Sequence, residues 1–362
     1  MRVLIAGGGT GGHLFPGVAI AEEVRARDAG AAVQFVGTAR GIEARVLPEL
    51  GWDLALIQVS GLKTVGAWGA VKGLARLPRA LWQARRIVKR FKPDAVIGVG
   101  GYASGPVVLM AWLARVPTAI CEQNSIPGFT NKLLGRLVRR VFLAFAESRR
   151  FFKASKIEMS GNPVRRDLVA RLSAPSTPAP PSAAQLTVLV SGGSLGAVAV
   201  NELASQALIA LAKERALTVI HQTGQADADK IAARYREAGV TAEVTAFVKD
   251  MAAAYLRADL IVCRAGATTV AELAIAGKPA IFIPYPFAAD NHQERNAAEM
   301  AAAGAALSYR QADLTADQLA AAIEPLLDDD ARRAAMGATM RSLARPHAAG
   351  VIVEWCQAQR PS

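Results

Sequence analysis

Residues 3–13, with the sequence VLIAGGGTGGH, combine a short apolar run with a glycine-rich turn. Such a run is typical of a buried β-strand, and the glycines allow the backbone to turn tightly into a following helix. The same succession returns at residues 186–196, LTVLVSGGSLG, about half the chain later. The sequence therefore starts a strand–loop–helix unit twice.

Further continuous apolar runs follow each start. They lie at residues 32–36, 95–99, 118–120 and 141–143 in the first half, and at 218–221, 260–263 and 280–284 in the second. Continuous rather than alternating runs indicate parallel strands that are buried on both faces. Because helical stretches separate them, we predict an α/β fold with two Rossmann-like, doubly wound domains. Ligands of such sheets bind where the strands end, at their carboxyl edge.

The chain length of 362 residues also favours two domains. Hydrophobic residues make up 52% and charged residues 20%, which excludes a disordered or fibrous chain. Four prolines within residues 175–182 predict a linker near the boundary. We place one domain at residues 1–164 and a second at 165–344, with the tail 345–362 packing back on the first.

The cysteines and the apolar segments restrict the environment. Cys121, Cys263 and Cys356 are odd in number and lack metal-ligand spacing, which argues against a disulfide scaffold and a structural zinc site. Residues 107–121, the longest apolar candidate, contain Arg115 and a proline, too short a run for a membrane span. Without a signal-peptide pattern, we expect a soluble or peripheral protein in the cytoplasm.

The net charge of +12 is distributed unevenly. Residues 1–165 hold 24 Lys/Arg and 10 Asp/Glu, whereas residues 166–362 hold 18 and 20. The whole excess therefore lies in the first half, which we expect to meet an anionic partner such as nucleic acid or an acidic membrane surface.

The first glycine-rich turn fits the pattern G-x-G-x-x-G, which also occurs in dinucleotide-binding domains. Those domains place an acid about 20 residues further on to hold a ribose, but no acid follows the second predicted strand before Glu43. What remains is a loop whose N–H groups face a polar ligand, or a tight turn that binds nothing. His13 at its rim is a candidate general base, or else a helix-capping residue.

Other strand ends in the first half carry polar groups. Residues 98–106 form a third glycine-rich loop, and Glu122, Gln123 and Asn124 follow the next predicted strand. These side chains offer hydrogen bonds to a hydroxyl-rich ligand, or only complete their own loops. Arg165 ends a rigid turn and could clamp an anion, although a surface arginine in an ordinary turn is an equal alternative.

The second half carries a different pattern at residues 263–272, CRAGATTVAE. Gly, Ala and Thr at a helix start leave N–H groups and hydroxyls for a phosphate, and Glu272 could bind both hydroxyls of a ribose. The alternative for Glu272 is an acid favoured by the helix dipole. Gln293, in a polar cluster at another helix start, could contact sugar hydroxyls.

Two acidic clusters resemble metal-binding carboxylates, at residues 227–229 and 328–330. Neither follows a predicted strand, so helix capping and solvation explain them better. We therefore predict no metal site.

Taken in order, six motifs resemble the MurG family of bacterial N-acetylglucosaminyltransferases. They are GGTGGH at 8–13, GGY at 100–102, EQN at 122–124, GNPVR at 161–165, GGSLG at 192–196 and RAGATTVAE at 264–272. The resemblance implies the GT-B arrangement, two Rossmann-like domains facing each other across a cleft. It implies transfer of N-acetylglucosamine from UDP-N-acetylglucosamine to the 4-hydroxyl of the muramyl sugar of lipid I. The anomeric centre is inverted, and lipid II for peptidoglycan synthesis is formed, on which cell shape and division depend.

The resemblance also implies roles for individual residues. The second domain is the donor domain, with Ser194, the backbone at Val248 and Glu272 on the uridine and ribose, and with Gln293 on the sugar. The diphosphate and sugar edge meet the helix start formed by Ala267, Thr268, Thr269, Val270 and Ala271. Arg165 reaches the nucleotide, while Thr10, Gly11, Gly12 and Asn124 line the acceptor side. The family often has His where this chain has Cys121, so His13 gains weight as the base.

Sugar transfer develops negative charge on the departing diphosphate, and a helix N-terminus can stabilise it without a tightly held metal. We therefore expect no tightly bound cofactor, although Mg²⁺ could act in assays.

A lipid acceptor requires contact with a membrane, and residues 54–93 contain nine Lys/Arg and no Asp or Glu. On a helical wheel the apolar side comprises Leu74, Leu77, Leu81, Val88 and Phe91, and the opposite side Arg79, Trp82, Arg86, Lys89 and Arg90. We expect the helix to start at Pro78 and to face an anionic membrane through Trp82, Arg85, Arg86 and Lys89. The alternative is a core-facing helix with a solvated basic face. We place the protein peripherally on the cytoplasmic face of the cell membrane.

Three other functions compete with this interpretation. Related GT-B enzymes include diacylglycerol glucosyltransferases, which use another acceptor, and UDP-N-acetylglucosamine epimerases, which use none. A nucleic-acid-binding protein would explain the positive charge. However, aromatic residues amount to only 6% and no nucleic-acid-binding motif is present, so we predict no nucleic-acid partner.

Overall fold

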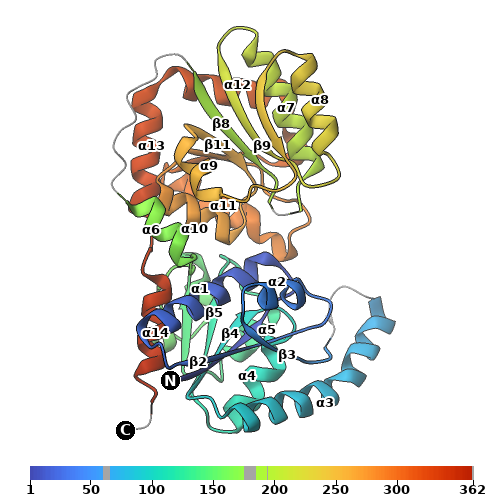
Figure 1. Cartoon of the computed structure of the whole chain (residues 1–362), viewed down its shortest axis with the longest axis vertical. Helices are drawn as coiled ribbons and strands as arrows, with labels where there is room; N and C mark the ends of the chain where they lie inside the picture. Colours follow the sequence, from blue (N-terminus) through green and yellow to red (C-terminus); the bar gives the residue numbers. More distant parts are fainter. Residues whose placement is uncertain (60–65, 175–184, 194, 361–362) are drawn as a thin grey trace. The chain divides into compact units, whose positions relative to one another are not determined.

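The computed structural model describes residues 1–59, 66–174, 185–193 and 195–360. The chain divides into two compact units, which comprise residues 1–166 with 345–362, and residues 167–344 (Figure 1). The boundary lies after residue 166 rather than after residue 164. The proline-rich segment predicted as a linker, residues 175–182, lies outside the described residues.

The first unit contains a parallel sheet with strand order β3-β2-β1-β4-β5-β6-β7. Its strands are β1 Arg2–Gly7, β2 Ala32–Gly37, β3 Asp53–Leu56, β4 Ala95–Gly100, β5 Thr118–Glu122, β6 Arg140–Leu143 and β7 Ile157–Glu158. Its α-helices are α1 Gly11–Arg27, α2 Glu43–Glu49, α3 Gly66–Phe91, α4 Ser104–Leu113, α5 Phe129–Leu134 and α14 Ala348–Gln357.

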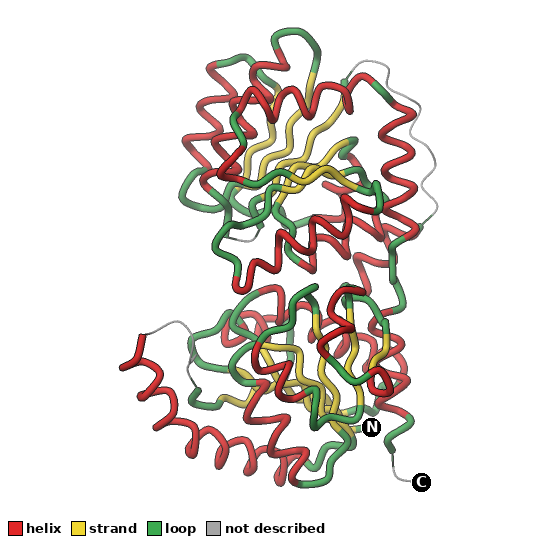
Figure 2. Tube along the Cα trace, turned by 180° about the vertical axis from the view of Figure 1, so that it is seen from behind, coloured by secondary structure: helices red, strands yellow, loops and turns green. Residues whose placement is uncertain are grey.

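Both faces of this sheet are buried, as continuous apolar strands require. Val3 and Ile5 of β1 belong to a core shared with α1 and α14. Leu4 and Ala6, which point to the opposite face, belong to a second core shared with α3 and α4. Figure 2 shows the strands of each unit as one layer with helices on both sides.

The second unit repeats this plan with strand order β10-β9-β8-β11-β12-β13. Its strands are β8 Leu186–Ser191, β9 Leu217–Gln222, β10 Thr241–Thr245, β11 Leu260–Cys263, β12 Ala280–Phe282 and β13 Ala306–Ser308. Its helices are α7 Val198–Ala212, α8 Ala228–Glu237, α9 Met251–Arg257, α10 Ala267–Ala276, α11 His292–Ala302, α12 Ala316–Asp328 and α13 Asp330–Ser342. The helix α6 Arg166–Ser173 begins at the unit boundary. The predicted fold class, two doubly wound parallel α/β units, is confirmed.

Four strands were not predicted, namely β3, β7, β10 and β13. All four lie at a sheet edge and are two to five residues long. They therefore lack the long continuous apolar run of a central strand. β10, for example, alternates exposed and half-buried residues. The run at residues 280–284 ends as a strand at Phe282, two positions before a proline that has no N–H to donate.

The prediction that the basic helix starts at Pro78 is wrong, because α3 begins at Gly66 and contains Pro78. The φ angle of proline is compatible with a helix, and the local costs are one lost hydrogen bond and a clash of the ring with the carbonyl four residues earlier. Burial of Ala80, Ala84 and Val88 against the first unit holds the helix beyond the proline.

Candidate active site

The first glycine loop packs against the loop after β4. Gly9 and Gly101 have φ angles of +91° and +78°, in the region that favours glycine. A Cβ at Gly101 would overlap the carbonyl oxygen of Gly8, so the two loops meet backbone to backbone. This close approach brings the carboxyl ends of β1 and β4 together.

His13 lies in the first turn of α1, at the junction of these loops. Its Nδ1 is 3.2 Å from Oγ1 of Thr10, and a Cβ at Gly100 would overlap its ring. His13 is half-buried, whereas Thr10 and Gly12 are exposed. The imidazole therefore lies at an accessible strand edge, with one ring nitrogen in contact with Thr10.

Glu43 braces this loop from behind, a role that the sequence analysis missed. Its buried carboxylate accepts hydrogen bonds from Gly9 N at 2.6 Å, from Thr38 N at 2.8 Å and from Thr38 Oγ1 at 3.0 Å. A Cβ at Gly8 or Gly41 would overlap the carboxylate. Glu43 could have been noticed in the sequence because it is the first acid after β2. Its carboxylate binds the loop backbone from the inner side.

Glu122 ends β5 and is buried. Its carboxyl group accepts hydrogen bonds from Asn124 N at 3.0 Å and from Asn131 Nδ2 at 2.8 Å. Burial raises the pKa of Glu122 to about 7, although these hydrogen bonds act in the opposite direction. Asn124 is half-buried at the same strand end.

The second glycine loop follows β8 and packs against the turn after β9. Gly196 has a φ of +77°, and a Cβ there would overlap the carbonyl oxygen of Thr223. Gln222 donates from Nε2 to Gly193 O at 2.8 Å and accepts at Oε1 from Val248 N at 3.0 Å. Ser194, predicted to contact the nucleotide, lies outside the described residues.

Helix α10 starts directly after β11 with Gly266 at the N-cap position, and no side-chain hydrogen bond caps it. The first-turn N–H groups of a helix have no partner within the helix and attract anions. Ala267 is buried there, and Thr268 and Thr269 are half-buried. The first turn of α10 therefore has the type of N–H groups that attract an anion.

Glu272 lies further along α10 and accepts a hydrogen bond from the hydroxyl of Tyr255 at 2.8 Å. Burial raises the pKa of Tyr255, and the neighbouring Glu272 raises it further. The phenol therefore stays protonated and orients the carboxylate. Val270 and Ala271 lie beside Glu272 in the same helix, with Val270 buried.

Gln293 in α11 accepts a hydrogen bond from Tyr285 N at 3.0 Å. The left-handed residues Asp290 and Asn291 turn the chain into this helix.

Two further residues hold the carboxyl edge of the second sheet and were not singled out from the sequence. Arg264 donates to the carbonyl oxygens of Ile283 and Pro284, at 2.9 and 3.0 Å, and the buried Asn296 donates to Ala265 O at 3.2 Å.

Arg165, which the sequence analysis placed in the donor domain, lies in the first unit. Its guanidinium carbon is 5.7 Å from the ring centre of Phe15 in α1.

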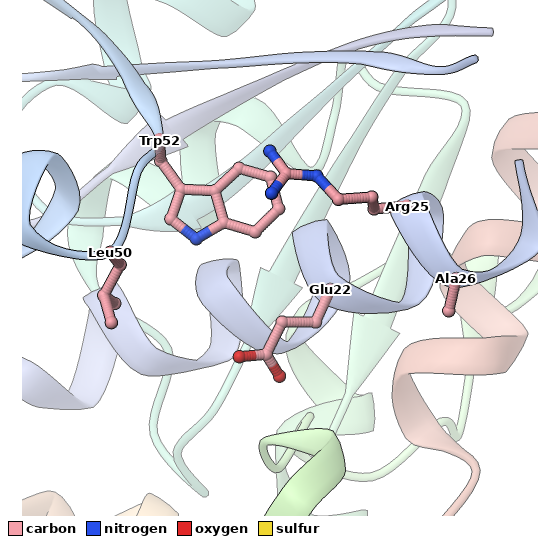
Figure 3. A pocket seen from close by; sticks show the side chains of 5 residues that line it. All are labelled: Glu22, Arg25, Ala26, Leu50 and Trp52. Atoms are coloured by element: carbon pink, nitrogen blue, oxygen red, sulfur yellow. The ribbon is translucent and has the colours of Figure 1, made fainter. Parts of the chain in front are cut away.

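A surface pocket of about 390 Å³ lies elsewhere on the first unit, lined by Glu22, Arg25, Ala26, Leu50 and Trp52 (Figure 3). The guanidinium carbon of Arg25 is 3.8 Å from the ring centre of Trp52. Trp52 precedes β3, so this pocket lies toward the amino ends of the strands. It contains none of the predicted site residues.

Among the described residues, no three His, Cys, Asp or Glu side chains are grouped so that they could hold a metal ion. No helix in the described ranges is long and apolar enough to cross a membrane.

Comparisons with known proteins agree with this arrangement. The glycosyltransferase family 28 N-terminal domain matches residues 3–143, and the family 28 C-terminal domain matches residues 187–350. Among solved structures, MurG from Acinetobacter baumannii has a TM-score of 0.81 and 35% identity, with 99% of both chains covered. A UDP-GlcNAc 2-epimerase from Neisseria meningitidis has a TM-score of 0.70 at 13% identity, over 99% of this chain and 100% of that chain, which is a similarity of fold alone.

Curated relatives carry the name UDP-N-acetylglucosamine–N-acetylmuramyl-(pentapeptide) pyrophosphoryl-undecaprenol N-acetylglucosamine transferase. One from Anaeromyxobacter sp. (strain Fw109-5) is 50% identical over 357 residues, 98% of this chain and 93% of the relative. Another from Myxococcus xanthus (strain DK1622) is 49% identical over 357 residues, 98% of this chain and 92% of the relative.

The fold, the glycine loop that follows the first strand of each unit, and these matches define a GT-B glycosyltransferase that depends on UDP-N-acetylglucosamine. Within that class, the chain belongs to the MurG family of peptidoglycan precursor synthesis. The resemblance stated from the six sequence motifs is thereby confirmed, and the alternative GT-B functions and nucleic-acid binding are not favoured.

Proposed function

We propose that the second unit binds UDP-N-acetylglucosamine, and that the first unit presents the 4-hydroxyl of the muramyl sugar of lipid I to it. The products are lipid II and UDP, with inversion at the anomeric carbon. One observation carries the assignment, since the two carboxyl edges differ in chemistry. The first unit holds an oriented imidazole, whereas the second holds an uncapped helix start beside an oriented carboxylate.

The donor is proposed to lie along α10. Its first turn, from Ala267 to Thr269, faces the diphosphate, and its dipole stabilises the charge that grows on the leaving group. Glu272, held by Tyr255, accepts the ribose hydroxyls. The backbone at Val248 and Ser194 hold the uridine, and Gln293 at the start of α11 contacts the sugar.

The acceptor is proposed to lie beside His13, with Thr10, Gly11, Gly12 and Asn124 around it. The imidazole takes the proton of the 4-hydroxyl while that oxygen bonds to the anomeric carbon. The bond to the diphosphate oxygen breaks on the opposite face, which inverts the centre. The pair of electrons leaves with UDP. Nδ1–H of the imidazole donates to Thr10 Oγ1, which orients the ring while Nε2 takes the proton.

No tightly bound metal is part of this proposal, because the helix start and its N–H groups supply the positive potential at the diphosphate. A Mg²⁺ ion added in assays would be held by the diphosphate oxygens of the donor.

Arg165, on the first unit, is proposed to reach the nucleotide.

Attachment to a membrane is proposed through α3. Trp82 is 60% exposed, and Arg85, Arg86 and Lys89 are exposed with it. The Arg86 guanidinium carbon lies 5.7 Å from the Trp82 ring centre. An amphipathic aromatic ring among cations suits the headgroup region of an anionic bilayer. We further propose that this attachment is to the cytoplasmic face of the cell membrane.

Charge reversal tests the attachment. Replacing Arg85, Arg86 and Lys89 with Glu should weaken binding to phosphatidylglycerol vesicles about a hundredfold or more, since each cation near the surface contributes about 1 kcal/mol. Sedimentation with vesicles measures this effect. The matched control replaces Lys213, Arg236 and Arg332, exposed cations of the second unit, with Glu. Equal losses in both triple variants would contradict attachment through α3.

Transfer of radiolabel from UDP-N-acetylglucosamine tests the activity. Label should appear in a lipid I analogue, and not in diacylglycerol supplied in its place. Label in diacylglycerol would indicate another acceptor, and release of a free sugar without any acceptor would indicate an epimerase.

A further inference from the structure

Gln222 is the last residue of β9 and is only 2% exposed. Its side chain donates to Gly193 O in the glycine loop and accepts from Val248 N in the segment after β10. Only one orientation of the carboxamide satisfies both partners. Gly193 O needs a donor, which is Nε2, and Val248 N needs an acceptor, which is Oε1. Gln222 therefore joins two separate backbone segments.

These two segments belong to the strand edge at which the nucleotide is proposed to bind. Gly193 O also accepts a hydrogen bond from Gly196 N at 3.0 Å, which closes the turn of the glycine loop. Val248 follows a segment that the turn after β9 anchors, since Gly224 N donates to Ala246 O at 3.1 Å. The carboxamide thus sets the distance between two backbones that are each locally ordered.

A neutral group with one donor and one acceptor is required at this position. A carboxylate could accept from Val248 but would repel Gly193 O, and an ammonium group could do only the reverse. Asn201 of α7 further holds the turn that follows β9, because it donates to Thr223 O at 2.9 Å and to Asp227 Oδ2 at 2.8 Å. Its Oδ1 lies 3.2 Å from Nε2 of the buried His221.

We propose that Gln222 is a positioning residue for the donor, which fixes the spacing between the glycine loop and Val248 and so sets the affinity for a uridine diphosphate sugar. This inference rests on the proposed donor site in the second unit. Gln222 acts through these backbones rather than on the reacting atoms.

The test uses Gln222→Glu at two pH values. A protonated carboxyl group has one donor and one acceptor, as the carboxamide does, whereas the carboxylate has acceptors only. Burial raises the pKa of such a carboxyl group above its ordinary value, so the protonated form is favoured at pH 5.5 over pH 8.0. Burial lowers the pKa of the adjacent His221 to about 3, so it does not titrate in this range. Asp227, which faces Asn201, is present in both proteins.

Calorimetry with UDP-N-acetylglucosamine gives the ratio of variant to wild-type Kd at each pH. We expect a ratio within about threefold at pH 5.5 and of about tenfold or more at pH 8.0. The control is Gln185→Glu, because Gln185 also donates to a strand carbonyl, Leu217 O at 3.1 Å, but at the amino end of the sheet. The Gln185→Glu ratio should stay near one at both pH values.

A ratio near one for Gln222→Glu at both pH values, or the same rise for Gln185→Glu, would overturn the inference. Failure of the wild-type chain to bind the nucleotide sugar would instead overturn the proposed donor site. Amide hydrogen exchange of the wild-type chain gives a second measurement that needs no variant. Val248 N–H should be protected in the absence of nucleotide, and exchange at the rate of an unbonded amide would contradict the bridge.

Discussion

The two glycine loops have the same place in their units but are braced by different side chains. A buried carboxylate, Glu43, holds the loop after β1 by accepting from Gly9 N and Thr38 N. A neutral carboxamide, Gln222, holds the loop after β8 by donating to one backbone and accepting from another. The same fold therefore supports a negative brace in one unit and an uncharged brace in the other.

The backbone groups that each brace contacts explain this difference. Glu43 is surrounded by donors, namely Gly9 N, Thr38 N and Thr38 Oγ1, so a carboxylate, which has acceptors only, fits there. Gln222 lies between the acceptor Gly193 O and the donor Val248 N, so a carboxylate in its place would repel Gly193 O. The comparison indicates that each brace matches the hydrogen-bonding groups of the backbone that it holds.

The largest expected effect separates catalysis in the first unit from binding in the second. His13→Ala should lower kcat about a thousandfold because it removes the general base, and should leave KM for UDP-N-acetylglucosamine within about twofold. The radiolabel transfer assay measures both constants. His347→Ala, which removes an exposed histidine at the start of α14, serves as the control. A kcat for His13→Ala close to that of this control would remove His13 as the base.

The units should also differ in their response to pH. Burial raises the pKa of Glu122 to about 7 in the folded first unit, above its value of about 4.5 in an unfolded chain. Folding therefore takes up a proton between these values, and the free energy of unfolding falls by about 3 kcal/mol as pH rises from 4.5 to 7. Glu122→Gln should abolish that slope.

Tryptophan fluorescence during urea unfolding follows this effect, because all five tryptophans lie in the first unit. The second unit should respond in the opposite direction, since burial lowers the pKa of His221 to about 3. Its stability is present above about pH 6.5 and falls as pH drops toward 3. A fluorescence midpoint that rises between pH 4.5 and 7 would contradict the assignment to Glu122.

A smaller effect is expected from the donor side. Glu272→Ala should raise KM for UDP-N-acetylglucosamine about thirtyfold, because a hydrogen bond to a charged group is worth about 2 kcal/mol, with little change in kcat. Steady-state kinetics with varied donor measures it. Glu324→Ala, a half-exposed glutamate on α12, is the control. A normal KM would exclude Glu272 from the ribose.

The smallest effect tests the first brace. Glu43→Gln leaves one N–H of Gly9 or Thr38 facing an amide donor, so the first unit should lose about 1–3 kcal/mol of stability and kcat should fall about tenfold. Thermal unfolding and the transfer assay measure these changes. Glu49→Gln changes the exposed acid at the other end of α2 and should alter neither. Unchanged stability of Glu43→Gln would show that the carboxylate is dispensable as a brace.

Much of the fold could be predicted from the sequence, because central strands are continuous apolar runs that end in glycine turns. Val3 to Ala6 and Leu186 to Val190 carry this signal without ambiguity. Edge strands such as β10 and β13 could not be predicted, since their short or alternating patterns occur equally in loops. The start of α3 was missed because Pro78 was given too much weight as a helix breaker.

The sequence predicts candidate site residues near glycine loops and helix starts that follow a strand, as at His13 and Glu272, and the roles of these residues stay predictions. The residues that brace the site were not, because their partners are distant in sequence. Glu43 bonds to Gly9, Gln222 bonds to Gly193 and Val248, and Asn296 bonds to Ala265. Only the folded backbone shows these pairs.

The return of the C-terminal segment to the first unit has a consequence for biosynthesis. Ile352 and Val353 of α14 complete the core that contains α1, and Glu354 pairs with Arg27 at 3.0 Å. A ribosome therefore releases the second unit before it supplies the last helix of the first. Every nascent chain therefore carries an unfinished core in its first unit until α14 is translated. A product that terminates before α14 exposes the apolar surface that α14 covers, and is a natural target for chaperones and proteases.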